Sequence, residues 1–326
     1  MHLALHPVPA SSDGDAHPAP APDPYDPIAA AHDLAARGRQ WIRASGLLAL
    51  PVPREYGGLG ASWKTIGDVL RIVARTDGAL AHRLGLHHLQ IAGIRLTGNA
   101  RQQRRLLFET IEHDVFWGEA LDPLDKRLVA RPTAGGYVLD GAKGCASSSV
   151  ASDRLTVCAW DPLAHGTLVA VLPTQRDGVA VHADWNAFGL RQAASGTVTL
   201  TGVQLAEDDV LQPAARAATP RAALRAQVAQ MIVANVYVGL AEGALAAARG
   251  EAQPWFQVLV RPAQVLAGDA AAALDDAFAR GHHLTGRERR EVALAAAEAK
   301  VVARNAAVEI GRHALGGTLR APAAYA

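Results

Sequence analysis

The residues best suited to chemistry are a histidine in an apolar helix and a serine in a polar turn. His87 lies in "DGALAHRLGLHHLQIAG" (residues 77–93), where Leu80, Leu84 and Ile91 share its helical face. An imidazole on such a face points inward and must find a hydrogen-bond partner. Because imidazole titrates near neutral pH, His87 could transfer a proton, or it could bond a backbone carbonyl in the core. His88 faces about 100° away and is assigned a structural role.

Ser147 stands in "GAKGCASSSVASD" (residues 141–153), between two segments with the pattern of strands. Serine clusters are typical of turns, so one role of this hydroxyl is to cap a strand end. A hydroxyl can also donate a hydrogen bond to charge that develops on a bound group. The residues alone leave both roles open.

No metal site is predicted from the histidines and cysteines. His282 and His283 are adjacent, but no third ligand lies at a useful spacing. Cys145 and Cys158 also lack the spacing of metal ligands. Such sparse cysteine use favours a reducing compartment, and we therefore expect a cytoplasmic protein.

Composition excludes several classes of function. The chain has 326 residues, a formal net charge of +1 and 50% hydrophobic residues. That charge gives no electrostatic case for binding nucleic acid or an anionic membrane. No run of about 18 apolar residues occurs, so no membrane span is predicted, and the first ten residues lack the pattern of a signal peptide. Residues 1–27 are rich in proline and are predicted to form a disordered tail.

The chain after this tail begins with a helical part and continues with a β part. Residues 28–114 show helical periodicity, with Ser62 and Asp77 as candidate N-caps. Residues 115–212 hold short β runs, including a strand, a Gly-Gly turn and a second strand in "RLVARPTAGGYVLDGA".

Residues 219–326 return to helix. Helices are predicted at about 221–250, 263–280 and 285–315, the last with a capping box that starts at Thr285. Separate runs of helix and strand predict an α+β fold rather than a doubly wound sheet. The expected architecture is an N-terminal helical domain, a small central β-barrel and a C-terminal helical bundle.

The order of these parts and several motifs resemble the acyl-CoA dehydrogenase superfamily. "LPVPREYGGLGAS" (residues 50–62) is similar to its N-terminal signature loop, and "DWNAFGLRQAASGTVTLTGVQL" (184–205) to a segment of its β domain. Three further motifs resemble its flavin-dependent monooxygenase branch, which includes dibenzothiophene and dimethylsulfone-type enzymes. They are "GLHHLQ" (85–90), "FWGEALDPLD" (116–125) and "GAKGCASSSVASD" (141–153).

The resemblance implies the oxygenase component of a two-component monooxygenase. Such a component binds reduced FMN that a separate flavin reductase supplies, and O2 then forms a C4a-hydroperoxyflavin. This species oxygenates a small substrate, often an organosulfur compound. Members of the branch are commonly homotetramers, so a homo-oligomer is expected, with no nucleic-acid or membrane partner.

The resemblance also assigns roles to residues. His87 matches the active-site histidine of the branch and would pass a proton to the peroxide or the leaving water. Ser147 matches a serine beside the reactive edge of the flavin, where its hydroxyl would donate to N5 or to the peroxide. The residues expected to line the flavin are Ile91, Glu119, Ala120, Leu121, Asp122, Pro123, Leu124, Lys143, Gly144, Cys145, Ala146, Ser147 and Gln253.

The chain departs from the branch at several places, among them Cys145, Ala146 and Ser148 in the serine segment. Glu119 stands where the branch has Asn, and its carboxylate would repel an anionic reduced flavin. Gln253 stands where an Arg near the FMN phosphate is expected, so a positive charge is lost. The C-terminal segment Arg-x-x-x-Thr-His-x-x-His-Asp, which supplies a second histidine, has no match, and the chain is expected to be shortened there.

Two other interpretations stay open at the level of sequence. One is a degenerate member of the fold without turnover, which these departures favour. The other is an acyl-CoA dehydrogenase with FAD in place of FMN, although no segment matches the catalytic glutamate of that subfamily. Binding of reduced FMN, followed by formation of the C4a-hydroperoxyflavin when O2 is admitted, separates an active monooxygenase from the first of these.

Overall fold

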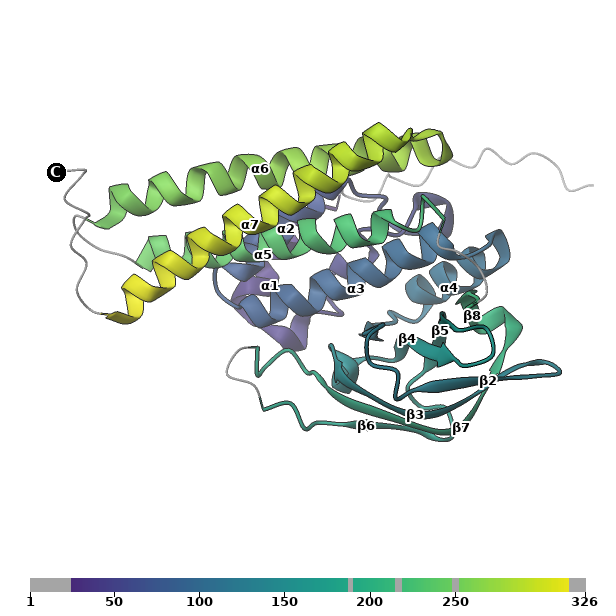
Figure 1. Cartoon of the computed structure of the whole chain (residues 1–326). Helices are drawn as coiled ribbons and strands as arrows, with labels where there is room; N and C mark the ends of the chain where they lie inside the picture. The colour runs from purple at the N-terminus through teal and green to yellow at the C-terminus, as the bar shows by residue number, and fades with distance from the viewer. Residues whose placement is uncertain (1–24, 187–189, 215–218, 248–251, 317–326) are drawn as a thin grey trace, which may run out of the picture.

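The computed structural model describes residues 25–186, 190–214, 219–247 and 252–316. The predicted tail falls mostly outside these residues, and the first helix begins at Pro27, where Asp26 accepts a hydrogen bond from the backbone of Ile28. Four helices form the N-terminal part of the bundle (Figure 1). They are α1 (Pro27–Arg37), α2 (Trp63–Ala74), α3 (Gly78–Thr97) and α4 (Ala100–Glu112).

The predicted N-caps are confirmed. Ser62 accepts from the backbone of Thr65 at the start of α2, and Asp77 accepts from the backbone of Leu80 at the start of α3. These contacts satisfy N–H groups that have no partner inside the helix. Of the four helices, α3 packs against α2 and α5 on one side and against the sheet on the other. This position makes α3 the helix that can carry a site between the two parts.

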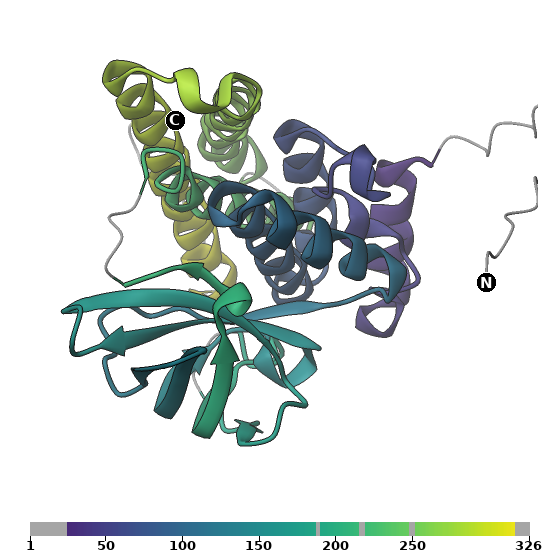
Figure 2. The ribbon, with the colours of Figure 1, turned by 90° about the vertical axis from the view of Figure 1, so that its right-hand side faces the viewer.

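Eight strands form the central part, which lies below the helices in Figure 2. They are β1 (Trp117–Ala120), β2 (Val129–Thr133), β3 (Gly136–Ala146), β4 (Arg154–Asp161), β5 (Gly166–Pro173), β6 (Val179–His182), β7 (Gly196–Ala206) and β8 (Val210–Gln212). Their order is β6-β7-β3-β2-β4-β5-β8, and β1 pairs with β4 in parallel. The end strands β6 and β8 are not paired with each other, so the predicted barrel is an open one with its own apolar core.

Three helices follow the sheet. They are α5 (Leu224–Ala247), α6 (Ala252–Arg280) and α7 (Gly286–Gly316). The capping box at α7 is confirmed, because Thr285 and Glu288 exchange hydrogen bonds between backbone and side chain. The expected start of α6 near residue 263 is wrong, since the helix begins at Ala252 and continues through Pro262. A proline removes one backbone hydrogen bond, and the packing of α6 against α5 and α7 holds the helix across that gap.

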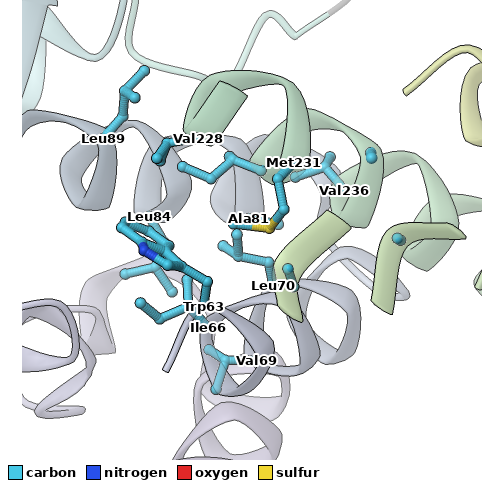
Figure 3. Close-up of a cluster of buried hydrophobic side chains, with 14 of the residues drawn as sticks. Trp63, Ile66, Val69, Leu70, Ala81, Leu84, Leu89, Val228, Met231 and Val236 are labelled. Carbon is cyan, nitrogen blue, oxygen red and sulfur yellow. The ribbon is translucent and has the colours of Figure 1, made fainter. Parts of the chain in front are cut away.

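The N-terminal and C-terminal helices share one core. Trp63 and Leu70 of α2 meet Val228 and Met231 of α5 in a buried cluster (Figure 3). By length and composition α5 could cross a membrane, but half of its most apolar stretch is buried. Contacts with α2, α3, α6 and α7 identify it as the central helix of the bundle. The α+β fold is therefore as predicted: a helical bundle built from both ends of the chain, set on a central sheet.

Candidate active site between the sheet and the bundle

Two cavities lie along α3 where the bundle meets the sheet. The larger has a volume of about 730 Å³ and lies at the N-terminal end of α3. Its lining residues are Gly78, Ala79, His82, Leu190, Arg191, Gln192, Val233, Val236, Tyr237 and Leu240. Apolar side chains of α5 therefore form one wall, and a histidine of α3 faces them.

The smaller cavity has a volume of about 310 Å³ and lies at the C-terminal end of α3. Its lining residues are Gln90, Gly93, Ile94, Thr97, Leu121, Pro123, Thr156, Cys158, Thr167, Val169, Leu211, Gln212, Ala222 and Arg225. Thr156 is 4% exposed, and its hydroxyl has no hydrogen-bond partner among the described residues. This wall is thus more polar than that of the larger cavity.

Glu119 contacts two residues that line the smaller cavity. Its Oε2 accepts a hydrogen bond from Gln90 Nε2 at 2.8 Å and from Arg225 Nη2 at 2.9 Å. Arg225 therefore supplies an opposite charge at contact distance, which offsets the carboxylate charge that was expected to repel a reduced flavin. These three side chains come from α3, β1 and α5, and they join the three elements at one point.

The predicted serine segment meets Glu119 through the backbone. The Glu119 N–H donates to the Ser147 carbonyl at 3.0 Å, which brings together the two segments assigned to the flavin. The Ser147 hydroxyl is half-buried and has no hydrogen-bond partner among the described residues. Cys145 and Ser148 both have positive φ angles, of 52° and 57°. For residues other than Gly such angles cost energy and often occur at functional sites.

The buried side chain of Lys143 connects the Ser147 segment to the loop that follows Glu119. Its side chain is 1% exposed, and its Nζ donates to the backbone carbonyls of Asp122 (2.6 Å) and Asp125. The ammonium group therefore fixes the loop after β1 to the end of β3.

The other residues predicted to contact the flavin differ in their exposure. Leu121 and Pro123 line the smaller cavity. Ala120 and Ala146 are buried in the core of the sheet, so only their backbone could face a ligand. Leu124 is 88% exposed and faces solvent.

Within one chain, Gln253 lies far from the other residues that are predicted to contact the flavin. It lies at the start of α6, and its side chain falls outside the described residues. Arg225 lies in the first turn of α5, whose 24 residues separate the two by about 36 Å of helix.

His87 occupies a different position from the one predicted for a proton donor. It is fully buried, its Nδ1 accepts from the Trp117 N–H at 3.2 Å, and its Nε2 lies 3.0 Å from the Leu48 carbonyl. The ring therefore carries its proton on Nε2, and both nitrogens are bonded to backbone. Burial lowers the pKa of His87 to about 3, and the neighbouring His88 adds to this shift. His87 is thus the core histidine that the sequence left open, and Ile91 beside it is also fully buried.

His82 is the histidine that the cavity contains, and sequence reasoning missed it. It is half-buried, it lines the larger cavity, and its ring has no hydrogen-bond partner among the described residues. Burial lowers its pKa, while the Glu119 carboxylate opposes that shift. The signal that could have found it is helical spacing, because His82 lies on one stripe with Gln90, Gly93 and Thr97. Arg225 was missed as well, and nothing in its sequence context marks it.

Comparisons with known proteins agree with this geometry. A model of the acyl-CoA dehydrogenase N-terminal domain matches residues 22–114. A probable FMNH2-dependent monooxygenase, SfnC of Pseudomonas putida, is 37% identical over 297 residues, covering 83% of this chain and 75% of the relative. Dibenzothiophene monooxygenase of Rhodococcus qingshengii is 35% identical over 311 residues, also covering 83% of this chain and 75% of the relative.

Solved structures give the same result. Methanesulfinate monooxygenase MsuC of Pseudomonas fluorescens has a TM-score of 0.83 and 33% identity, covering 90% of this chain and 87% of that one. Dibenzothiophene monooxygenase TdsC of Paenibacillus sp. A11-2, in its FMN-bound form, has a TM-score of 0.82 and 27% identity, covering 92% and 88%. The chain therefore belongs to the acyl-CoA dehydrogenase superfamily and, within it, to the FMNH2-dependent monooxygenases.

Proposed function

We propose that this chain is the oxygenase component of a two-component monooxygenase that uses reduced FMN and O2 on a small organosulfur compound. The observation that carries the proposal is His82, whose ring lines the cavity of about 730 Å³ and has no hydrogen-bond partner among the described residues. The charge of the Glu119 carboxylate also acts on this ring. A cavity of this volume is in the range of small-molecule sites. The relatives named above act on dibenzothiophene or methanesulfinate, which supports an organosulfur substrate.

The residues present fit a flavin. Backbone groups of the Glu119 and Ser147 segments meet at one point. The half-buried Ser147 hydroxyl lies there, and none of the described residues gives it a hydrogen bond. Backbone and hydroxyl groups of this kind can bind the polar edge of a ring system. Residues 119–121 and 145–147 would hold the ring, and the bound FMN would supply the electrons that activate O2.

The chain's own residues then have separate tasks. Burial lowers the pKa of His82 and so favours the neutral ring, which can accept or return a proton at a ring nitrogen. The Ser147 hydroxyl donates a hydrogen bond to charge that develops on the bound group. Val233, Val236 and Leu240 exclude water and form an apolar surface for the substrate.

The test is an anaerobic titration of the purified chain with reduced FMN, followed by addition of 18O2 and an organosulfur substrate. The expected result is saturable binding and one 18O atom in the product, detected by mass spectrometry. A chain that binds reduced FMN but never transfers oxygen to any sulfide, sulfone or sulfinate offered would be the degenerate member of the fold. Absence of binding would contradict the proposal altogether.

A flavin reductase and a second copy of the chain are the partners that we propose. The reductase follows from the need for reduced FMN. The second copy is supported by apolar residues at intervals of seven on the outer faces of α6 and α7, where they share one face of each helix. These exposed residues are Val258, Val265, Leu294, Val301 and Val308. Free cysteines at Cys145 and Cys158 are consistent with a reducing cytoplasm.

A further inference from the structure

We infer that Arg225 is a positioning residue for the flavin: it holds Glu119 in a clamp with Gln90 and offsets the carboxylate charge beside the flavin. This clamp is defined as the side chains of Gln90, Glu119 and Arg225. The inference rests on the proposed function, because the charge matters only if an anionic reduced flavin binds there.

The geometry of the clamp is specific. One carboxylate oxygen, Oε2, receives both donors, and Arg225 Nη2 also lies 3.3 Å from Gln90 Oε1. All three side chains therefore contact one another. The Glu119 and Arg225 side chains are 17% and 28% exposed, so water screens their charges only in part.

The surroundings leave room for this guanidinium. A Cβ atom at Gly93 would lie 3.3 Å from Arg225 Nε, closer than an ordinary contact. At the first turn of α5, the Arg225 N–H donates to the Ala222 carbonyl at 3.1 Å, which fixes the backbone that carries the side chain. Gly93 and this turn together set the guanidinium against β1.

The clamp also reaches the predicted reactive edge. Glu119 is bonded through its side chain to Arg225 and through its backbone to the Ser147 carbonyl. A change at Arg225 therefore acts on the Ser147 segment through Glu119. Without the guanidinium, the site would keep a lone carboxylate that favours a neutral flavin over an anionic one.

The experiment compares binding of oxidised and reduced FMN by four chains: the wild type, Arg225→Gln, Glu119→Gln and the double variant. We expect Arg225→Gln to weaken binding of reduced FMN about tenfold relative to oxidised FMN, because the carboxylate then stands alone. Glu119→Gln should shift the ratio of the two dissociation constants the other way, since an unpaired cation favours the anion. The double variant should return to the wild-type ratio.

Two further measurements separate the clamp from a merely structural contact. The reduction potential of bound FMN should become more negative in Arg225→Gln, because it follows the same ratio. Thermal unfolding of each chain without flavin shows whether the fold survives. The matched control is Arg75→Gln, which breaks an Arg–Glu pair between α2 and α5, where Arg75 Nε lies 2.7 Å from Glu242 Oε2. This control should leave the ratio unchanged.

The outcomes are distinguishable. If both single variants shift the ratio in the same direction, or neither shifts it, the clamp inference is wrong while the proposed function stands. If the wild type binds neither form of FMN, the proposed function and the inference fall together.

Discussion

His82 and His87 lie on the same helix, and the face that each occupies decides its role. Five residues on an α-helix turn the side chain by about 140°. His87 therefore shares a stripe with leucines and is buried between backbone groups, whereas His82 faces a cavity.

The first prediction contrasts alanine substitutions at these two positions. His82→Ala should lower oxygenation by about 10²–10⁴-fold, as expected for loss of a proton-transfer group, with little change in stability. His87→Ala should lower the free energy of unfolding by about 2–4 kcal/mol, because it leaves a cavity and two backbone groups without partners. Steady-state kinetics and urea unfolding of both variants check this. A stable but inactive His87→Ala would reverse the assignment.

A second prediction concerns acid stability. Burial lowers the pKa of His87 to about 3 and of His88 to about 4, from 6.5 in each case. The unfolded chain therefore binds more protons than the folded chain between about pH 3 and pH 6.5, and stability falls as pH falls through that window. Each histidine contributes a slope of about 1.4 kcal/mol per pH unit in the part of the window where only the unfolded form is protonated.

Urea unfolding at pH 7.5, 6 and 5 tests this slope. His88→Gln should remove part of it, and His113→Gln, a change on the surface of the molecule, is the matched control and should not. A free energy of unfolding that stays constant from pH 7.5 to 5 would show that neither histidine is buried as described.

At the residue scale, the sequence predicts which segments form the site better than it predicts which side chains face the cavities. The Glu119 and Ser147 segments meet as expected, because a motif fixes the backbone path of a strand end. The inward orientation of His87 agrees with its stripe of leucines, and its catalytic role stays a prediction. Arg225 could not be found, since its partner lies 106 residues away in sequence.

At the scale of elements, close contacts between helices depend on particular glycines. A Cβ atom at Gly239 of α5 would lie 2.5 Å from the Arg71 carbonyl oxygen and 2.6 Å from Ala74 Cβ in α2. Real Cβ atoms do not approach backbone so closely, so α2 and α5 meet there only because the side chain is absent.

The third prediction uses this contact. Gly239→Ala should lower the free energy of unfolding by about 1–3 kcal/mol, because the two helices must move apart. Gly268→Ala in α6 is the control: nothing lies within 4 Å of its Cβ position, so the better helix propensity of alanine should raise stability by up to about 1 kcal/mol. Thermal or urea unfolding compares the two. Equal effects would mean that α2 and α5 are not in contact as described.

The starts of helices were predictable where the sequence contains a capping side chain. Ser62, Asp77 and the Thr285 box mark helix starts in the structure as in the sequence. The start of α6 was not, because Pro262 looks like a boundary until neighbouring helices are known.

For the whole molecule, the outer faces of α6 and α7 predict association. Val301 and Leu294 are more than half exposed and lie on one face of α7. We expect the double variant Leu294→Glu/Val301→Glu to be monomeric by light scattering under conditions where the wild type forms an oligomer. The control is Leu163→Glu, which changes an exposed leucine in the turn between β4 and β5 and should leave the mass unchanged. A monomeric wild type would contradict the prediction.

The overall architecture followed from the order of helical and β segments, because each part must bury its own apolar face. The joining of the N-terminal and C-terminal helices into one bundle did not, since only packing such as that of Trp63 and Leu70 of α2 against Val228 and Met231 of α5 reveals it.

The two faces of α3 have a consequence for directed evolution. Side chains that point to the bundle are nearly all fully buried, whereas Ala79 and His82 face the larger cavity together with Val233 and Val236 of α5. A library that randomises Ala79, Val233 and Val236 while leaving His82 and the leucine stripe intact would explore substrate size at little cost in folding. Selection for activity on bulkier substrates could therefore proceed at these three positions alone.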